Sequence, residues 1–120
     1  MVSTGVHALP AELARVADLA GRLATTKSRI VRAALALACI VDVAEVRYAV
    51  ERLKALEGAC RQSGIHLPVD ELTDLDRIAG VLAVPRSRLV RAAVVLFLRV
   101  DSDRQRGLVD GLPVAGRLLR

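Results

Sequence analysis

The stretch SRIVRAALALA, residues 28–38, returns fifty-nine residues later as SRLVRAAVVLF, residues 87–97. Each copy begins with a serine, carries arginines at its second and fifth positions, and continues into apolar residues. A helix of this kind can bury its apolar body while its basic first turn faces an anion, because N–H groups at a helix N-terminus point outward. The pattern therefore predicts two buried helices with basic N-termini.

The two copies belong to a longer internal repeat. When residue n is aligned with residue n + 59, 17 of the 38 pairs between 5–42 and 64–101 are identical. A unit of about 40 residues buries too little surface to fold alone, so each copy needs its sister. We expect one compact domain in four parts: a first motif at 1–42, a connecting helix at 43–61, a second motif at 62–101 and a tail at 102–120.

Composition limits the class of protein. The chain has 120 residues, 53% of them apolar but with one Tyr, one Phe and no Trp, which favours closely packed aliphatic helices. No apolar run reaches the roughly 18 residues of a membrane helix, and no secretory leader pattern opens the chain. Cys39 and Cys60 are expected to be reduced thiols, which indicates a cytoplasmic protein. The net charge of +5 is a modest indication of a nucleic-acid partner.

Local patterns predict the elements of each copy. Apolar and polar residues alternate over 2–8 and 62–67, which is typical of short half-buried strands, and we expect these strands to pair with each other in antiparallel fashion. Helices follow at 11–23 and 70–82, and again from Thr26 to Ile40 and from Pro85 to Val100. A capping box at Asp42 predicts a further helix from Val43 to about residue 58. Four glycine or proline positions predict a fraying, though apolar, tail.

The order of strand, helix, short basic turn and buried helix resembles the ribbon-helix-helix superfamily of DNA-binding proteins (the Arc, MetJ and CopG type). The resemblance rests on GVHALP with LARVADLAGRLATTKSRIVRAAL in the first copy, and on IHLP with LTDLDRIAGVLAVPRSRLVRAAV in the second. It covers about 80 of the 120 residues, in the tandem single-chain form of TraY-type conjugation proteins. The expected fold class is therefore mostly α with one short two-stranded antiparallel β-ribbon, a tandem ribbon-helix-helix pseudo-dimer.

The resemblance implies two kinds of contact with double-stranded DNA. The ribbon would enter the major groove, and the outward residues of its strands would meet base edges. Both histidines of the chain lie at matched outward positions, and a metal role for them has no neighbouring ligands in its favour. The expected base contacts are Ser3, Gly5, His7, Gln62, Gly64 and His66. Because this ribbon has no central Arg, Lys or Asn, we expect DNA shape and phosphate contacts to contribute more than direct readout.

The N-termini of the two repeated helices would hold phosphates, and about six neutralised phosphates imply a log–log salt slope near −5. Pro85 removes one donor, so the second anchor should be slightly poorer. Ser28 and Ser87 could instead be plain helix-start residues. Arg32 and Arg91 fit an ion pair with a carboxylate of the preceding helix as well as they fit DNA. The expected phosphate contacts are Thr26, Lys27, Ser28, Arg29, Arg86, Ser87 and Arg88.

The sequence thus predicts a sequence-specific DNA-binding protein, a bacterial repressor or a plasmid or phage accessory factor, located at the nucleoid. One alternative is an antitoxin whose tail at 102–120 binds a toxin. Another is a helical protein-interaction module without DNA, which would use 43–60 to bind a second copy. No Ser/His/Asp spacing favours an enzyme, and no catalytic residue, cofactor, metal or membrane partner is expected.

Overall fold

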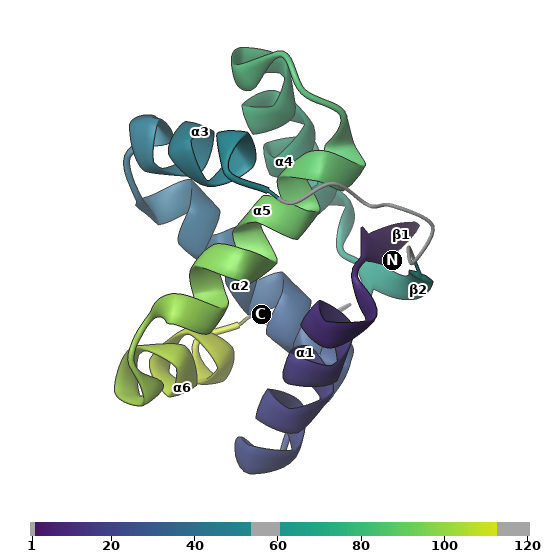
Figure 1. The fold of residues 1–120 in the computed structure, drawn as a ribbon, viewed down its shortest axis with the longest axis vertical. Coiled ribbons are helices and arrows are strands. Elements are labelled where there is room, and N and C mark those ends of the chain that lie inside the picture. Colours follow the sequence, from purple (N-terminus) through teal and green to yellow (C-terminus); the bar gives the residue numbers. More distant parts are fainter. Residues whose placement is uncertain (1, 54–60, 113–120) are drawn as a thin grey trace, which may run out of the picture.

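The computed structural model describes residues 2–53 and 61–112, with the backbone alone for 2–7 and 61–66. These residues form two strands and six helices (Figure 1). In chain order the elements are β1 (Val2–Ala8), α1 (Pro10–Arg22), α2 (Lys27–Ile40), α3 (Val43–Glu51), β2 (Arg61–Leu67), α4 (Val69–Leu82), α5 (Arg86–Arg99) and α6 (Ser102–Asp110).

β1 and β2 pair in antiparallel fashion and form a two-stranded ribbon. Gly5 lies opposite Gly64 at the centre of the register. These two glycines are equivalent in the repeat, so a pseudo-twofold axis passes between them. Ala8 and Leu67, which end the two strands, are both buried against the helices. The ribbon therefore joins the two copies of the repeat, and each copy contributes one strand, as the alternation in the sequence predicts.

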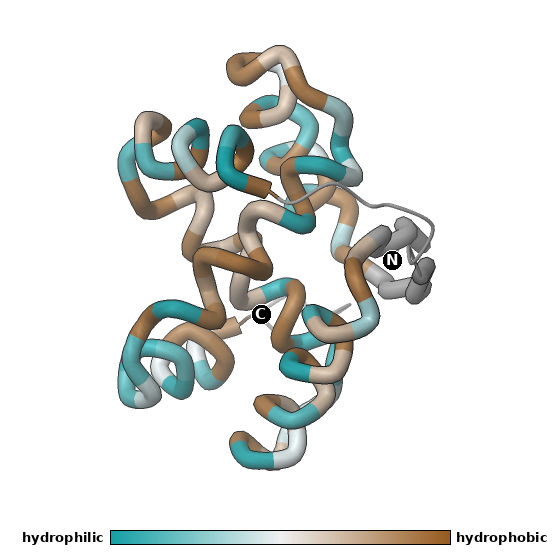
Figure 2. Tube along the Cα trace, viewed as in Figure 1, coloured by the Kyte–Doolittle hydropathy of each residue, from teal (hydrophilic) through white to brown (hydrophobic). Residues whose placement is uncertain are grey.

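The core lies where α2 and α5 cross (Figure 1). Ala33 and Ala34 of α2 and Ala92 and Ala93 of α5 have no exposed surface, and such small side chains allow two helix backbones to approach closely. Hydrophobic residues run along both crossing helices, and hydrophilic ones occupy the outer sides of the surrounding helices (Figure 2). α1 and α4 flank the crossing on the ribbon's side, and α3 and α6 lie on the opposite side (Figure 1).

The repeat extends one helix further than the sequence identities indicate. α6 spans 102–110, which is α3 at 43–51 displaced by 59 residues. Asp42 and Asp101 cap these helices through the same interaction, because each side chain accepts a backbone N–H from the first turn. The prediction of a fraying tail is therefore wrong for 102–112. The last eight residues of that tail lie outside the described residues.

The architecture predicted from the sequence needs correction at the level of the whole fold. A tandem ribbon-helix-helix pseudo-dimer has four helices, and the sequence adds one connecting helix. The described residues instead form a body of six helices, with α3 and α6 forming an additional pair on the side away from the ribbon. The connecting helix is also shorter than predicted, since α3 ends at Glu51 and Arg52 is its C-terminal cap. We therefore describe the fold as a six-helix body that carries one ribbon.

Among the described residues, no helix has both the length and the apolar character needed to cross a membrane.

Candidate nucleic-acid interface

The ribbon register places all six predicted base-contact residues on one face. Ser3 lies opposite His66, Gly5 opposite Gly64, and His7 opposite Gln62. Directly opposite residues in an antiparallel pair share a face, and successive residues alternate between faces. Ala8 and Leu67 belong to the other alternation and are buried. The six residues therefore occupy strand positions on the ribbon face opposite the one that the helices cover.

The first turn of α2 is formed by a threonine cap. The Thr26 hydroxyl oxygen accepts the backbone N–H of Arg29 at 3.2 Å, so the cap satisfies one of the free donors of this turn. The N–H groups of Lys27 and Ser28 have no carbonyl acceptor within the helix, because no helical residue lies four positions before them. They are therefore free donors at the helix end. Thr26 and Lys27 are exposed, and Ser28 is half-buried.

Pro85 stands at the N-cap of α5 and precedes its first helical residue, Arg86. Pro85 therefore precedes the first turn, where the equivalent Thr26 has a backbone N–H and Pro85 has none. That this missing donor makes the second anchor slightly poorer stays a prediction. The N–H groups of Arg86 and Ser87 occupy the same positions in α5 as those of Lys27 and Ser28 in α2. The two helix ends thus present equivalent backbone donors at these two positions, although only α2 has a side-chain cap.

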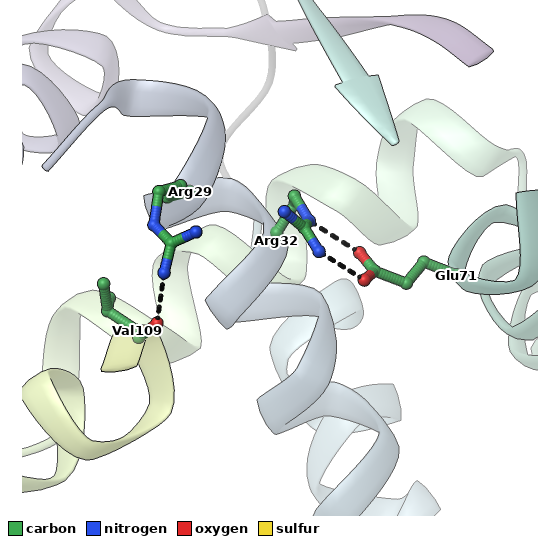
Figure 3. Close-up of polar contacts among 4 residues, drawn as sticks. All are labelled: Arg29, Arg32, Glu71 and Val109. Atoms are coloured by element: carbon green, nitrogen blue, oxygen red, sulfur yellow. Dashed lines mark hydrogen bonds and ion pairs between the residues drawn. The ribbon is translucent and has the colours of Figure 1, made fainter. Parts of the chain in front are cut away.

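Arg29 and Arg88, which the sequence places among the phosphate contacts, reach back to the additional helices. Arg29 Nη2 donates to the Val109 carbonyl oxygen at 2.9 Å, near the C-terminal end of α6 (Figure 3). Arg88 Nη2 donates to the Val50 carbonyl oxygen at 3.2 Å, near the end of α3. A guanidinium at the last turn of a helix satisfies free carbonyls and complements the helix dipole. These arginines therefore fasten α6 and α3 to the core.

Arg86 forms an ion pair across the turn between α4 and α5. Its Nε and Nη2 donate to the two carboxylate oxygens of Asp76 at 2.8 and 2.9 Å, and both side chains are close to half exposed. Lys27, by contrast, makes no ion pair with the described residues. Exposed Arg88 also has no carboxylate partner, but its guanidinium is bonded to a backbone carbonyl. Among the exposed cations of the predicted phosphate contacts, Lys27 is thus the one that makes neither an ion pair nor a side-chain hydrogen bond with the described residues.

Arg32 and Arg91 are buried in ion pairs that join the two copies. Arg32 donates to both carboxylate oxygens of Glu71 at 3.0 and 2.7 Å (Figure 3). Arg91 donates in the same way to Glu12 at 2.9 and 3.1 Å. The arginine side chains are only 4% and 3% exposed. Of the two roles that the sequence left open for these arginines, the structure shows the ion pair with a carboxylate of α4 or α1.

Glu12 links the ribbon to this network. Its Oε1 also accepts the backbone N–H of Leu9 at 3.0 Å, directly after β1. One carboxylate therefore holds the start of α1, the end of β1 and the guanidinium on α5. The ribbon is fixed to the helical body by a charged contact in addition to its buried apolar residues.

Sequence reasoning missed the polar contact that positions α6. Gln105 is buried, and its Nε2 donates to the Phe97 carbonyl oxygen at 2.9 Å. The carbonyl lies in the last turn of α5, where it also accepts the N–H of Val100, the C-terminal cap, at 3.3 Å. Val46 is the equivalent residue in α3, so the repeat itself gave no signal for a polar anchor here.

No family model, no curated protein and no solved structure matches this chain. The identification of the chain as a member of the ribbon-helix-helix superfamily is therefore withdrawn. The six-helix body exceeds the four helices that two such motifs provide, and no family model supports the assignment.

Proposed function

We propose that this protein binds double-stranded DNA, with the outer face of its ribbon in the major groove. The observation that carries the proposal is the β1–β2 register, which gathers both histidines and Gln62 on the face opposite the helices. A two-stranded ribbon fits the width of the major groove, and residues of one face can meet base edges.

The direction of the central helices supports the proposal. α2 and α5 begin on the ribbon's side of the molecule and end on the far side, where α3 and α6 lie (Figure 1). Their free N–H groups at Lys27, Ser28, Arg86 and Ser87 therefore flank the ribbon. Helix N-termini at this position suit the phosphates on either side of a groove.

The distribution of charge makes Lys27 the first residue to test. Arg29 and Arg88 are engaged with helix ends, and Arg86 is paired with Asp76. We therefore assign fewer side-chain phosphate contacts to the protein than the sequence predicts, and more of the anchoring to backbone N–H groups. A role as a repressor or as a plasmid or phage accessory factor is compatible with this mode of binding.

The experiment begins with selection of binding sites from a pool of random 30-base-pair duplexes. Fluorescence anisotropy then gives the Kd for a selected duplex and for its scrambled control at several salt concentrations. We expect the selected duplex to bind at least about 1,000-fold more tightly, as specific sites do. No enrichment of any sequence, with no salt-dependent binding to any duplex, would contradict the proposal.

Lys27→Ala should weaken binding to all duplexes by a similar factor and reduce the slope of log Kd against log salt by about 1, because one phosphate contact is lost. Arg106→Ala, which removes an exposed arginine of α6 on the far side, is the matched control and should leave the slope unchanged. An equal change of slope in both variants would show that net charge alone, and not a contact at Lys27, governs binding.

A further inference from the structure

A cavity of about 440 Å³ lies between α2, α4 and α6, and none of the predicted DNA contacts lines it. Its apolar wall includes Leu35 of α2, Leu75 and Ile78 of α4, and Leu108 and Leu112 from the region of α6. This volume falls within the range of small-molecule sites, which are mostly apolar and have a few polar groups that set orientation.

The cavity is bordered by carboxylates of α4. Asp70, Glu71 and Asp74 line it together with one cation, Arg32. Arg32 and Glu71 neutralise each other in their bidentate pair, which leaves the charges of Asp70 and Asp74 at an exposed rim. Arg77 approaches Asp74 only to 3.6 Å in an exposed pair, which compensates that charge weakly.

The thiol of Cys39 lies in the same lining and responds to these charges. Burial, and then the negative charge of Asp74, raises the pKa of this thiol above its ordinary value. A carboxylate whose field reaches the lining in this way would also attract a positively charged ligand.

The internal repeat provides a comparison within the same molecule, because the equivalent positions of the other half carry larger side chains. Phe97 stands where the cavity has Ala38, and Phe97 is fully buried. Tyr48 and Arg52 stand where the cavity has Gly107 and Gly111, and the Arg52 guanidinium lies 4.7 Å from the centre of the Tyr48 ring. Three larger side chains thus stand where the cavity has small residues. Phe97 is buried, whereas Tyr48 is 55% exposed and Arg52 is exposed.

The charge of the two places is reversed as well. Arg15 and Arg99 stand where the cavity has Asp74 and Ile40, and Ala11 stands where it has Asp70. One half of the pseudo-dimer therefore has larger and more basic residues at these positions, whereas the other half has a cavity that is apolar and acidic at its rim. A requirement for packing alone would be met equally well by the larger residues of the other half, and it explains neither the small residues nor the carboxylates of the cavity.

We infer that the cavity between α2, α4 and α6 binds a small organic cation with an apolar ring or chain. The apolar body would occupy the wall of leucine and isoleucine side chains, and the cationic group would lie at the rim beside Asp70 and Asp74. The inference is independent of DNA binding, and its test contains no DNA.

The test compares two probes that share one apolar body, 4-phenylbutylammonium and 4-phenylbutyrate, by isothermal titration calorimetry with the full chain. We expect one ligand per chain and an affinity at least tenfold higher for the cation. Asp70→Asn with Asp74→Asn should remove this preference, because it weakens the attraction of the cation and relieves the repulsion of the anion. Equal affinity for the two probes, or binding of neither, would overturn the inference.

Two further variants introduce into the cavity the larger residues that stand at the equivalent positions of the other half. Gly107→Tyr and Ala38→Phe should each weaken binding of the cation at least tenfold. Gly107→Tyr has room at the backbone, because a Cβ added there meets no atom within 4 Å, so this variant keeps the test valid if Ala38→Phe does not fold. Gly21→Tyr in α1, which is exposed and outside the cavity, is the control and should bind as the wild type does. Undiminished binding by Gly107→Tyr would place the ligand elsewhere.

Sedimentation velocity tests whether the occupant of the cavity is a small ligand or a second copy of the chain. The other half of the chain exposes Tyr48 and carries arginines, whose charge is opposite to that of the cavity rim. A head-to-tail contact between two copies would therefore also use the cavity. We expect a monomer at the concentrations of the titration. Self-association that the cation disperses and that Gly107→Tyr abolishes would assign the cavity to a second copy and overturn the ligand proposal.

Discussion

Burial distinguishes two arginine pairs that have the same bidentate geometry. Arg32 is 4% exposed in its pair with Glu71, whereas Arg86 is 41% exposed in its pair with Asp76. Exposed pairs contribute little because water screens them, whereas a buried charge that loses its partner keeps the full cost of desolvation. The two arginines should therefore respond very differently to the same substitution.

Arg32→Met should lower the free energy of unfolding by about 3 kcal/mol, because the partly buried Glu71 carboxylate is left without its cation. Arg86→Met, the control with the same change of side chain, should cost less than about 1 kcal/mol. Urea denaturation measures both. The double variant Arg32→Met, Glu71→Leu should recover much of the loss, and equal losses for Arg32→Met and Arg86→Met would contradict the structural role.

The sequence predicted the partner of Arg32 in part. An arginine one turn into a helix, after a helix that carries carboxylates, suggests an ion pair, and the structure has one. The choice of Glu71, from the opposite copy, depends on how α2 and α5 cross, and no local spacing encodes that crossing. The same reason explains why the contacts of Arg29 and Arg88 with Val109 and Val50 were missed.

The turns after α1 and α4 contain the two positive-φ residues other than glycine among the described residues, Ala24 at 54° and Ala83 at 56°. The next residue, Thr25 or Val84, donates its N–H to the carbonyl of Ala20 or Ala79, which closes each helix with a left-handed turn. A side chain with a Cβ costs about 1–2 kcal/mol in this conformation. Glycine is the residue that this turn favours, and both copies place alanine there.

Ala24→Gly combined with Ala83→Gly should stabilise the protein by about 1 kcal/mol in total, because relief of the left-handed strain exceeds the added entropy of the unfolded chain. The melting temperature measured by circular dichroism should rise by about 4 °C. Ala14→Gly, the same change at an exposed position within α1, is the control and should destabilise by about 1 kcal/mol. A lower melting temperature for the turn variant would contradict this account.

At the scale of elements, the strands and the four repeated helices were predictable because each has a clear period and a local start signal. β1 and the helices other than α3 and α6 lie within about one residue of their predicted ends, and β2 begins one residue earlier than predicted. α6 was missed because Gly107 and Gly111 suggested a loop, and because 102–112 shares three identities with 43–53. The shared cap at Asp101 was the available signal.

At the scale of the whole molecule, the fold is a pseudo-twofold body with different surfaces on its two sides. The ribbon and the starts of α2 and α5 lie on one side, and α3 and α6 lie on the other (Figure 1). The repeat preserves the residues that hold the halves together, including both buried arginine pairs, and it diverges around the cavity. The two proposals therefore concern separate regions, and each can fail without the other.

The measurement that most directly tests DNA binding through the ribbon is the specificity ratio, the Kd for scrambled DNA divided by the Kd for the selected duplex. It compares the wild type with His7→Ala, His66→Ala. The control is Arg47→Ala, Arg106→Ala, an exposed pair at equivalent positions of α3 and α6. We predict that the histidine variant lowers the ratio at least tenfold, since base contacts contribute about 1–3 kcal/mol each, while the arginine variant leaves it unchanged. An unchanged ratio for the histidine variant, or an equal loss in both variants, would contradict the recognition of DNA bases by the ribbon.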